Sequence, residues 1–240
     1  MSEAKVRLFV DQPLGPGQSV VLSRDQAHYL FGVMRLGQGD ALFLFNGQDG
    51  EWRADVAEAG KRGGTLVCAE MTKPQGAPPD LWLLFAPIKK ARTDFIIEKA
   101  VELGTARILP VQTEHTNSER IRRDRLQAHA TEAAEQCGIT YVPQVGELAR
   151  LDRVIADWPE DRSLWFCDEN LAGEGGGLMT RPAPAAILIG PEGGFSDAER
   201  DRLSGLAFAS AISLGPRILR ADTAAVAALT LWQSQIGDWR

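Results

Sequence analysis

From residue 81 onward the chain alternates between apolar runs and stretches with helical periodicity, and this alternation limits the fold more than any other feature. The runs cover residues 81–88, 106–111, 163–169, 185–190 and 208–215, and they are apolar nearly throughout. After the first run, residues 93–103 repeat apolar side chains at helical spacing, and Gly104 is placed to end that helix. Strands that are apolar on both faces and alternate with helices indicate a parallel sheet covered by helices on both sides.

Residues 1–71 follow a different pattern. Five short β-like runs, at 7–10, 19–23, 40–46, 51–59 and 64–71, are separated by the turn sequences GPG, GQG and NGQDG. This spacing predicts a small barrel-like β domain. Residues 72–80, TKPQGAPPD, contain three prolines and no large apolar side chain, which is typical of a linker. We therefore expect a β domain over residues 1–71 and an α/β domain over residues 81–240.

The composition is that of an ordinary globular protein, with 44% hydrophobic and 24% charged residues. No apolar run approaches the roughly 20 residues that span a bilayer, and residues 1–15 lack the apolar core of a signal peptide. The three cysteines lie far apart and the three histidines show no ligand spacing, so we expect no metal, no disulfide and a cytoplasmic location. The net charge of −6 excludes a surface that is basic throughout, but it leaves room for a local basic groove.

The final helical stretch, residues 223–237, contains no charged side chain. A helix with one face in water normally carries charge on that face, so we expect this helix to be buried nearly all round. A central core helix fits this pattern. A helix buried by an unusual threading of the chain, or against a second subunit, fits it equally well.

Two glycine-rich loops follow the last two apolar runs. Residues 190–194 read GPEGG, and residues 214–222 read LGPRILRAD. Ligands of open α/β sheets bind beyond the carboxyl ends of the strands, and glycines let a ligand approach the backbone N–H groups. Ser196 and Asp197 are placed to cap a helix through Arg202. The phosphate-loop and dinucleotide-binding motifs do not occur, so the two loops predict one small-molecule cleft without naming the molecule.

Taken in order, these motifs resemble the RsmE family of ribosomal RNA methyltransferases in the SPOUT superfamily. The resemblance rests first on LIGPEGGFSDAE (188–199) and LGPRILRADTAA (214–225). RLFV (7–10) and HYLFGVMRLGQGD (28–40) resemble the family's N-terminal PUA-like domain. FIIEKAVELG (95–104) and EAAEQCG (132–138) resemble the middle of its catalytic domain, so the likeness covers nearly the whole chain.

The resemblance implies a PUA-like β-barrel followed by an α/β trefoil-knot domain with a parallel sheet, through which the last helix is threaded. It also implies S-adenosylmethionine as the cofactor, held between the knot loops, and a homodimer. The cofactor-binding residues that it carries over are Leu188, Ile189, Gly190, Pro191, Glu192, Gly193, Gly194, Leu214, Gly215, Ile218, Leu219, Arg220, Thr223 and Ala224.

RsmE-like enzymes methylate N3 of a uridine in the 16S rRNA of the small ribosomal subunit, and the resemblance implies this reaction here. Such chemistry favours a cation beside the uracil carbonyl oxygens and a carboxylate as the base. Arg220 is the predicted cation, with a salt bridge or helix cap as its alternative role. Glu192 and Asp222 are the candidate carboxylates, with a structural role and helix N-capping as their alternatives. Asp222 stands where the family commonly has Glu, so the general base stays unassigned.

The candidate RNA contacts are basic residues of three regions: Arg7 and Arg35 in the first domain, Lys89, Lys90 and Arg92 after a strand end, and Arg120, Arg122 and Arg125 in residues 118–129, where Arg122 and Arg125 share one helix face. Ordinary surface salt bridges and a solvated helix face are the alternatives for them. On the helix that contains Arg125, the spacing predicts a buried stripe of Leu126, Ala130, Ala133 and Cys137.

Two further positions depart from the family pattern. Ile139 stands where the family often has a basic residue, and His115 stands where it often has Arg. Because histidine is mostly neutral at pH 7, we expect both changes to lower RNA affinity or to shift contacts to Arg120. We expect neither residue to touch the cofactor loops.

Three rival functions would use the same features differently. A SPOUT enzyme with another target, such as the ribose 2′-hydroxyl, would keep the cofactor loops. An RNA-binding ribosome assembly factor would have an inert cofactor pocket, which the retained Gly193, Gly194, Gly215 and Arg220 argue against. A phosphate-dependent enzyme is disfavoured because Glu192 would lie inside its anion-binding loop.

Overall fold

The computed structural model of the chain describes residues 4–118, 120–173 and 181–239. Its contacts divide the chain into two compact units. The first contains Met1–Ala77 together with Ala134–Val142, and the second contains Pro78–Ala133 and Pro143–Arg240. The predicted domain limits at residues 71 and 81 stay a prediction, and residues 134–142 pack with the first unit although no sequence feature placed them there.

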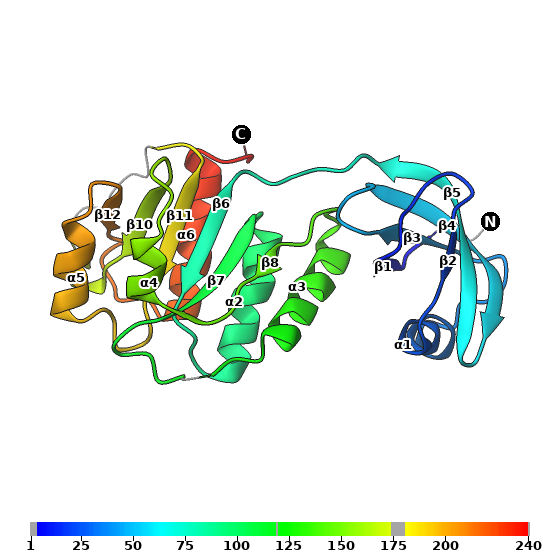
Figure 1. Cartoon of the computed structure of the whole chain (residues 1–240), viewed down its shortest axis with the longest axis horizontal. Coiled ribbons are helices and arrows are strands. Elements are labelled where there is room, and N and C mark those ends of the chain that lie inside the picture. Colours follow the sequence, from blue (N-terminus) through cyan, green and yellow to red (C-terminus); the bar gives the residue numbers. More distant parts are fainter. Residues whose placement is uncertain (1–3, 119, 174–180, 240) are drawn as a thin grey trace. The chain divides into compact units, whose positions relative to one another are not determined.

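The first unit is built on a five-stranded sheet in the order β1-β3-β4-β5-β2. β1 pairs with β3 in parallel, and the other neighbours are antiparallel. The strands match the five predicted runs, and a short helix α1 continues into the π-helix η1 between the second and third of them (Figure 1). The elements are β1 (Arg7–Phe9), β2 (Ser19–Val21), α1 (Arg24–Ala27), η1 (His28–Val33), β3 (Ala41–Phe45), β4 (Glu51–Gly60) and β5 (Gly63–Lys73).

Alternating side chains of these strands fill the core of the first unit. Leu42 and Leu44 of β3 are fully buried, as are Ala54 of β4 and Leu66 of β5. Leu30 of η1 completes the cluster, so the helical segment covers the apolar face of the sheet. Burial of this face is the main stabilising contribution to a β unit of this size.

One polar network crosses the edge of this unit. The guanidinium of Arg7 donates from Nε to Glu51 at 2.6 Å and from its other nitrogens to the backbone carbonyls of Ala134, Glu135 and Ile139 at 2.6–2.9 Å. The Arg7 and Glu51 side chains are only 12% and 3% exposed. Arg7 therefore ties residues 134–142 to the sheet, which explains why that segment belongs to the first unit.

This network makes the stability of the first unit depend on pH. Burial works to raise the pKa of Glu51, but hydrogen bonds from Thr72 and Arg7, with the charges of Arg7 and Lys73, outweigh it and lower the pKa below its ordinary 4.5. A lowered folded-state pKa adds stability that is fully present above pH 4.5 and is lost as the pH falls through the folded pKa. We expect Glu51→Gln to lower the free energy of unfolding by about 1.5–3 kcal/mol at pH 7, the usual worth of hydrogen bonds to a charged group.

Urea unfolding of the full chain between pH 7.5 and pH 3.5 measures this effect. The gap between wild type and Glu51→Gln should narrow steadily below pH 4.5, because the wild type then loses the same ionic hydrogen bonds. A gap that stays constant over the whole range would show that the charge of Glu51 contributes nothing.

The second unit is a seven-stranded sheet in which every described pairing is parallel, as the sequence predicts. Its order is β12-β10-β11-β6-β7-β8, and β9 pairs with the end of β7 (Figure 1). The elements are β6 (Leu81–Phe85), α2 (Lys90–Glu102), β7 (Arg107–Gln112), α3 (Arg123–Cys137), β8 (Gln144–Val145), β9 (Ala149–Arg150), α4 (Leu151–Ala156), β10 (Ser163–Cys167), η2 (Glu169–Leu171), β11 (Ala185–Ile189), α5 (Asp197–Ser204), β12 (Ala209–Ile212) and α6 (Ala221–Gln235).

Helices cover both faces of this sheet, as the apolar strands predict. On one face, alternate strand residues such as Phe166 and Leu188 pack in a cluster with Ile155 of α4 and Leu203 of α5. α6 contacts β11 and α2, and none of its residues belongs to that cluster, so it covers the opposite face. All five residues of β11 are buried, which places this strand in the middle of the three layers.

The final helix differs from its prediction. It begins at Ala221 and ends at Gln235, and it buries a stripe that includes Ala225, Leu229 and Trp232. The opposite stripe is open in the single chain, where Leu231 is 39% exposed. The prediction of nearly complete burial is therefore wrong for the isolated chain, because only one face of α6 meets the sheet and α2.

Helix α3 confirms part of its prediction. Leu126, Ala130 and Ala133 are buried, as their spacing predicts. Cys137 is exposed, so the predicted stripe ends one turn earlier than expected. Among the described residues, no helix is both long and apolar enough to cross a membrane.

Candidate active site

Three neighbouring strand ends meet at one edge of the second sheet. Cys167 at the end of β10 is in register with Ile189 of β11 on one side and with Ile212 of β12 on the other. Because all three strands run in parallel, the segments that follow them emerge at the same level. These segments are residues 168–172, 190–194 and 213–220, so the two predicted glycine-rich loops lie at one site together with a third loop.

The three segments enclose a cavity of about 180 Å³. It contains most of the residues that the resemblance carries over as cofactor-binding: Ile189, Gly190, Pro191, Glu192, Gly194, Leu214, Gly215, Ile218, Leu219, Arg220 and Ala224. Leu188 lies in the buried cluster beneath it. Gly193 and Thr223 are exposed and are not among the lining residues, so these three stay predictions without a direct place in the cavity.

Sequence reasoning missed the third wall. Asp168, Glu169 and Ala172 also line the cavity, as do Arg217 and Ala221. The signal was present in the sequence, because an Asp-Glu pair directly follows the apolar run of β10. The sequence does not show that this pair lies beside the glycine-rich loops, because that follows from the position of β10 between β11 and β12. Cys167 lines the cavity too, and burial raises the pKa of its thiol, so it is an apolar wall rather than a nucleophile.

Glycine is required in the GPEGG loop for a specific reason. Gly194 has φ +64°, and its N–H donates to the Pro191 carbonyl at 3.0 Å. A Cβ at Gly194 would lie 1.5 Å from Oε1 of Glu169, so a larger residue there would displace that side chain. Gly215 has φ +115°, yet a Cβ there would meet no atom within 4 Å. Gly194 therefore permits close packing of the GPEGG loop against Glu169, whereas Gly215 leaves open space beside the chain.

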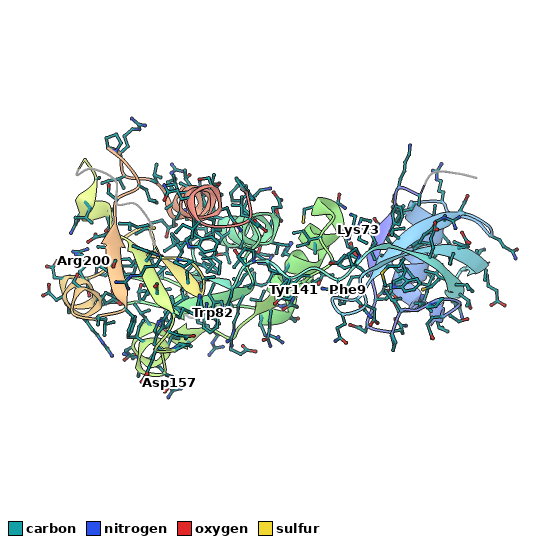
Figure 2. The ribbon with its side chains drawn as sticks, turned by 90° about the horizontal axis from the view of Figure 1, so that it is seen from above. Phe9, Lys73, Trp82, Tyr141, Asp157 and Arg200 are labelled. Atoms are coloured by element: carbon teal, nitrogen blue, oxygen red, sulfur yellow. The ribbon has the colours of Figure 1, made fainter. Side chains whose placement is uncertain are left out.

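Arg200 of α5, which is labelled in Figure 2, joins two of the walls. Its guanidinium donates to the Phe195 carbonyl, directly after the GPEGG loop, and to Asp197 at 2.6 Å. On the other wall it lies 3.8 Å from Glu169, and the side-chain oxygen of Asn170 accepts from it at 3.2–3.3 Å when that amide is oriented toward it. Arg200 thereby holds the Glu169 carboxylate against Gly194. The loop's helix is separately fixed by the predicted N-cap Ser196, which forms a reciprocal capping box with Glu199.

The three predicted catalytic side chains have different surroundings. Arg220 is the N-cap residue of α6 and makes no capping hydrogen bond, and no acid among the described residues pairs with it. Glu192 is exposed on the cavity loop, and no described cation neutralises it. Asp222 is 13% exposed and forms an ion pair with Arg92. Arg220 rather than Asp222 occupies the N-cap position of α6, although the Asp222 carboxylate accepts from the Thr223 N–H in the first turn at 3.0 Å.

Four of the predicted RNA contacts border a second hollow of about 300 Å³. They are Lys90, Arg120, Arg122 and Arg125, and the floor between them is apolar, with Ile88, Ile121 and Leu126. Arg125 is bound to Asp94 at 2.8 Å, and Arg122 to Asp124 at 3.2 Å. Lys90 and Arg120 are exposed, and no ion pair with either is found in the described part of the chain. We call this feature the basic hollow.

The other predicted RNA contacts lie outside the basic hollow. Lys89 is exposed at the N-cap of α2, and Arg92 is held by Asp222. Arg7 uses its guanidinium on Glu51 and backbone carbonyls, which favours a structural role over an RNA contact. Arg35 is exposed on the first unit, with φ +59°.

The structure also shows the contacts of Ile139 and His115, the two residues that depart from the family pattern. The carbonyl of Ile139 accepts from Arg7 at 2.8 Å, within the first unit. His115 follows β7, and its Nδ1 lies 2.9 Å from the carbonyl oxygen of Gly193. The expectation that His115 does not touch the cofactor loops is therefore wrong, because the end of β7 lies closer to the GPEGG loop than the sequence indicated.

A larger cavity of about 480 Å³ lies elsewhere in the second unit, between Gln112, Asp152 and Arg202. It contains none of the glycine-rich residues, and two of its charged side chains, Arg150 and Asp152, pair with each other at 3.1 Å. Chemistry therefore favours the smaller cavity as the active site. In the residues that the structure describes, no group of three or more His, Cys, Asp or Glu side chains is arranged to hold a metal ion.

Comparison with known proteins agrees with this geometry. An RNA methyltransferase domain family matches residues 75–233, and an RNA methyltransferase PUA domain family matches residues 22–67. Ribosomal RNA small subunit methyltransferase E of Synechocystis is 33% identical, over 88% of this chain and 71% of that protein. The Rickettsia conorii protein of the same name is 29% identical, over 93% of both chains.

A solved structure shows the same fold. The crystal structure of ribosomal RNA small subunit methyltransferase E from Neisseria gonorrhoeae, bound to S-adenosyl methionine, superposes with a TM-score of 0.89 at 26% identity and covers 98% of this chain and 99% of that one. The β unit followed by an α/β unit, the three strand-end loops and these matches over nearly the full length lead to one conclusion: the chain belongs to the ribosomal RNA small subunit methyltransferase E (RsmE) family.

Proposed function

We propose that this protein transfers the methyl group of S-adenosylmethionine to N3 of a uridine in the 16S rRNA of the small ribosomal subunit. The observation that carries the proposal is the cavity formed by three parallel strand ends, with glycine-rich walls on two sides and the unpaired Arg220 at its rim. Membership of the RsmE family and a relative whose crystal structure contains S-adenosyl methionine support the donor and the RNA target.

The cavity suits the methyl donor chemically. Ile189, Ile212 and Ala224 offer apolar contacts, while the backbone of residues 190–194 and 214–220 offers N–H and carbonyl groups at close range. The open space beside Gly215 lets a ligand lie directly against the chain there. Bound S-adenosylmethionine supplies an electrophilic methyl group. The residues that would hold it are those of the two glycine-rich loops, with Asp168 and Glu169 as polar groups on the third wall.

The uridine must present N3 to this methyl group. N3 lies on the pairing edge of uracil, so the base has to be unpaired and turned out of its stack. Its imide proton must leave, and the negative charge that develops spreads onto the two carbonyl oxygens. Arg220 is placed to stabilise that charge, because its guanidinium is exposed and unpaired among the described residues.

The surroundings of the two carboxylates favour Glu192 as the proton acceptor. Glu192 lines the cavity and has no ion-pair partner among the described residues. The Asp222 carboxylate is already paired with Arg92 and does not line the cavity. It accepts a hydrogen bond from the Thr223 N–H and thereby positions the start of α6 instead. The roles proposed for the site are thus a cation from Arg220, a base from Glu192 and a structural ion pair from Asp222.

The basic hollow is the proposed RNA contact of the second unit. Its rim offers the cations of Lys90 and Arg120 to phosphate groups, and its floor of Ile88, Ile121 and Leu126 offers an apolar surface to a base. The start of α2 links the two regions, since Lys90 borders the hollow and Arg92 forms an ion pair with Asp222 at the start of α6. Arg35 and Lys89 remain further proposed contacts.

We also propose that the protein acts as a cytoplasmic homodimer with the knotted topology of its superfamily. The uncharged open stripe of α6 supports this, because Leu231 is 39% exposed there and Ile218 of the neighbouring loop is 73% exposed. A second subunit packed on this stripe would bury apolar surface that the single chain leaves in water.

A methylation assay with purified small ribosomal subunits tests the function. After incubation with labelled S-adenosylmethionine, the rRNA is digested and its nucleosides are separated by mass spectrometry, and the label is expected in 3-methyluridine. Arg220→Ala should lower turnover by about 100-fold or more, the usual loss for one group that stabilises developing charge, while donor binding is kept. Arg217→Ala, a neighbouring arginine of the same cavity, is the matched control and should cost far less. A label on ribose, or unchanged turnover in Arg220→Ala, would contradict the proposed chemistry.

The packing of Gly194 predicts a second result. Gly194→Ala should weaken donor binding strongly, because the new Cβ would displace the Glu169 carboxylate from the cavity wall and because φ +64° strains any other residue. Gly193→Ala is the control, since a Cβ there would approach His115 at 3.3 Å and the neighbour can adjust. Calorimetry with S-adenosylmethionine should give a much larger loss for the first variant than for the second. Equal losses would mean that the contact between Gly194 and Glu169 does not shape the cavity.

Charge in the basic hollow predicts the salt dependence of RNA binding. The double variant Lys90→Ala with Arg120→Ala should bind small subunits more weakly and reduce the slope of log affinity against log salt by roughly 1.4–1.8, since each phosphate contact contributes about 0.7–0.9. Arg150→Ala removes an exposed arginine that is paired with Asp152 outside the hollow, and it should leave the slope unchanged. If both proteins keep the wild-type slope, the hollow does not bind phosphate.

A further inference from the structure

His115 contacts the GPEGG loop from the side that faces away from the cavity. Its Nδ1 lies 2.9 Å from the Gly193 carbonyl oxygen, and the residue itself is not among those that line the cavity. A carbonyl oxygen only accepts hydrogen bonds, so Nδ1 must carry the proton and Nε2 faces outward without a role in this bond. The imidazole is exposed, which means that this hydrogen bond is not a by-product of core packing.

The segment that presents His115 is itself well fixed. The Glu114 N–H donates to Oε1 of Glu199 at 2.9 Å, and the other oxygen of Glu199 accepts from the Ser196 N–H at 3.0 Å. The turn is closed by Thr116, whose hydroxyl lies 2.9 Å from both the N–H and the hydroxyl of Thr113. The segment 113–116 therefore forms a brace that is anchored to the start of α5, on the same side as His115.

The loop that receives this hydrogen bond needs a restraint. Two of its residues, Gly193 and Gly194, lose more backbone freedom on ordering than any other residue type would. Gly194 is held by Glu169 and Arg200 on one side, through the contacts at the third wall. Gly193 is exposed, and His115 supplies the hydrogen bond that holds its carbonyl on the other side. The peptide group between these anchors sets the position of Glu192 and Gly194, which do line the cavity.

We infer that His115 is a positioning residue for the methyl-donor loop, acting through the Gly193 carbonyl without touching the donor. The inference rests on the proposed function of the cavity. It assigns His115 a role in donor affinity, whereas its place in the family pattern suggested a weakened RNA contact. If His115 positions the loop, changing its side chain weakens the binding of S-adenosylmethionine. If His115 is an RNA contact, the same change weakens the binding of small ribosomal subunits.

Two amide substitutions separate the nitrogens of His115. In His115→Asn the side-chain amide nitrogen can take the place of Nδ1, so the hydrogen bond to Gly193 can be kept. In His115→Gln the amide reaches the place of Nε2 instead, so the bond is lost with a side chain of similar size and polarity. We expect the Kd and the KM for S-adenosylmethionine to rise by about 3- to 10-fold in His115→Gln, the effect of losing one neutral hydrogen bond, and to stay near wild type in His115→Asn.

Calorimetry with S-adenosylmethionine, binding of small ribosomal subunits to the donor-free protein and thermal unfolding are measured on both full-length variants. The inference requires weaker donor binding in the Gln variant alone, with unchanged subunit affinity and unchanged Tm. Equal donor affinity in all three proteins overturns it, as does an equal loss in both variants. A fall in subunit affinity with donor affinity intact would make His115 an RNA contact. If the wild type itself binds no donor, the proposed function fails at that earlier step, so the two failures are distinguishable.

Discussion

The parallel pairing of β10 with β11 on one side and β12 on the other is the constraint on which the site depends. Because Cys167 is in register with both Ile189 and Ile212, three chain segments leave the sheet at one level and at adjacent positions. Those segments have no further strand partners at that edge, so they form loops around one cavity. Nothing in the cavity requires an unusual side chain for this. The strand order alone converts two glycine-rich loops and an acidic pair, far apart in sequence, into the walls of one cavity.

A binding site formed largely by backbone needs loops that are held in one conformation. In the second unit, the side chains that restrain the loop lie outside the cavity. Gly194 lets the loop pack directly against Glu169, but two adjacent glycines also make the loop mobile unless it is restrained. Arg200 restrains it from the β10 wall through Glu169 and Phe195, and His115 does so from the β7 side through Gly193. Neither residue needs to contact a ligand. The loop residues that line the cavity and the side chains that fix the loop are therefore different groups, which is the usual condition for a preorganised site.

The sequence predicted those features that depend on local pattern. The apolar runs identified the strands and their parallel arrangement, and Ser196 identified the start of α5, because periodicity and capping are determined within a few residues. It failed where a contact joins distant segments. The ion pair of Arg92 with Asp222 spans 130 positions, so the sequence could not show that a predicted phosphate contact and a predicted base neutralise each other. The contact of Glu169 with Gly194 was hidden for the same reason, since it exists only after β10 is inserted beside β11. The exposed stripe of α6 was misjudged because an uncharged helix face indicates burial without saying which molecule provides it.

Which cations are paired and which are not explains how a chain with net charge −6 can offer a basic surface to RNA. Arg92, Arg122 and Arg125 are matched by Asp222, Asp124 and Asp94, and a matched cation contributes little field beyond its own partner. Lys90 and Arg120 have no such partner among the described residues, although they belong to the same hollow. The number of arginines in the sequence therefore overestimates the number of phosphate contacts. The net charge of the chain, in turn, underestimates the attraction of this surface for RNA. The quantity that matters is the number of unpaired cations on one rim, because only those release counterions when a phosphate replaces them.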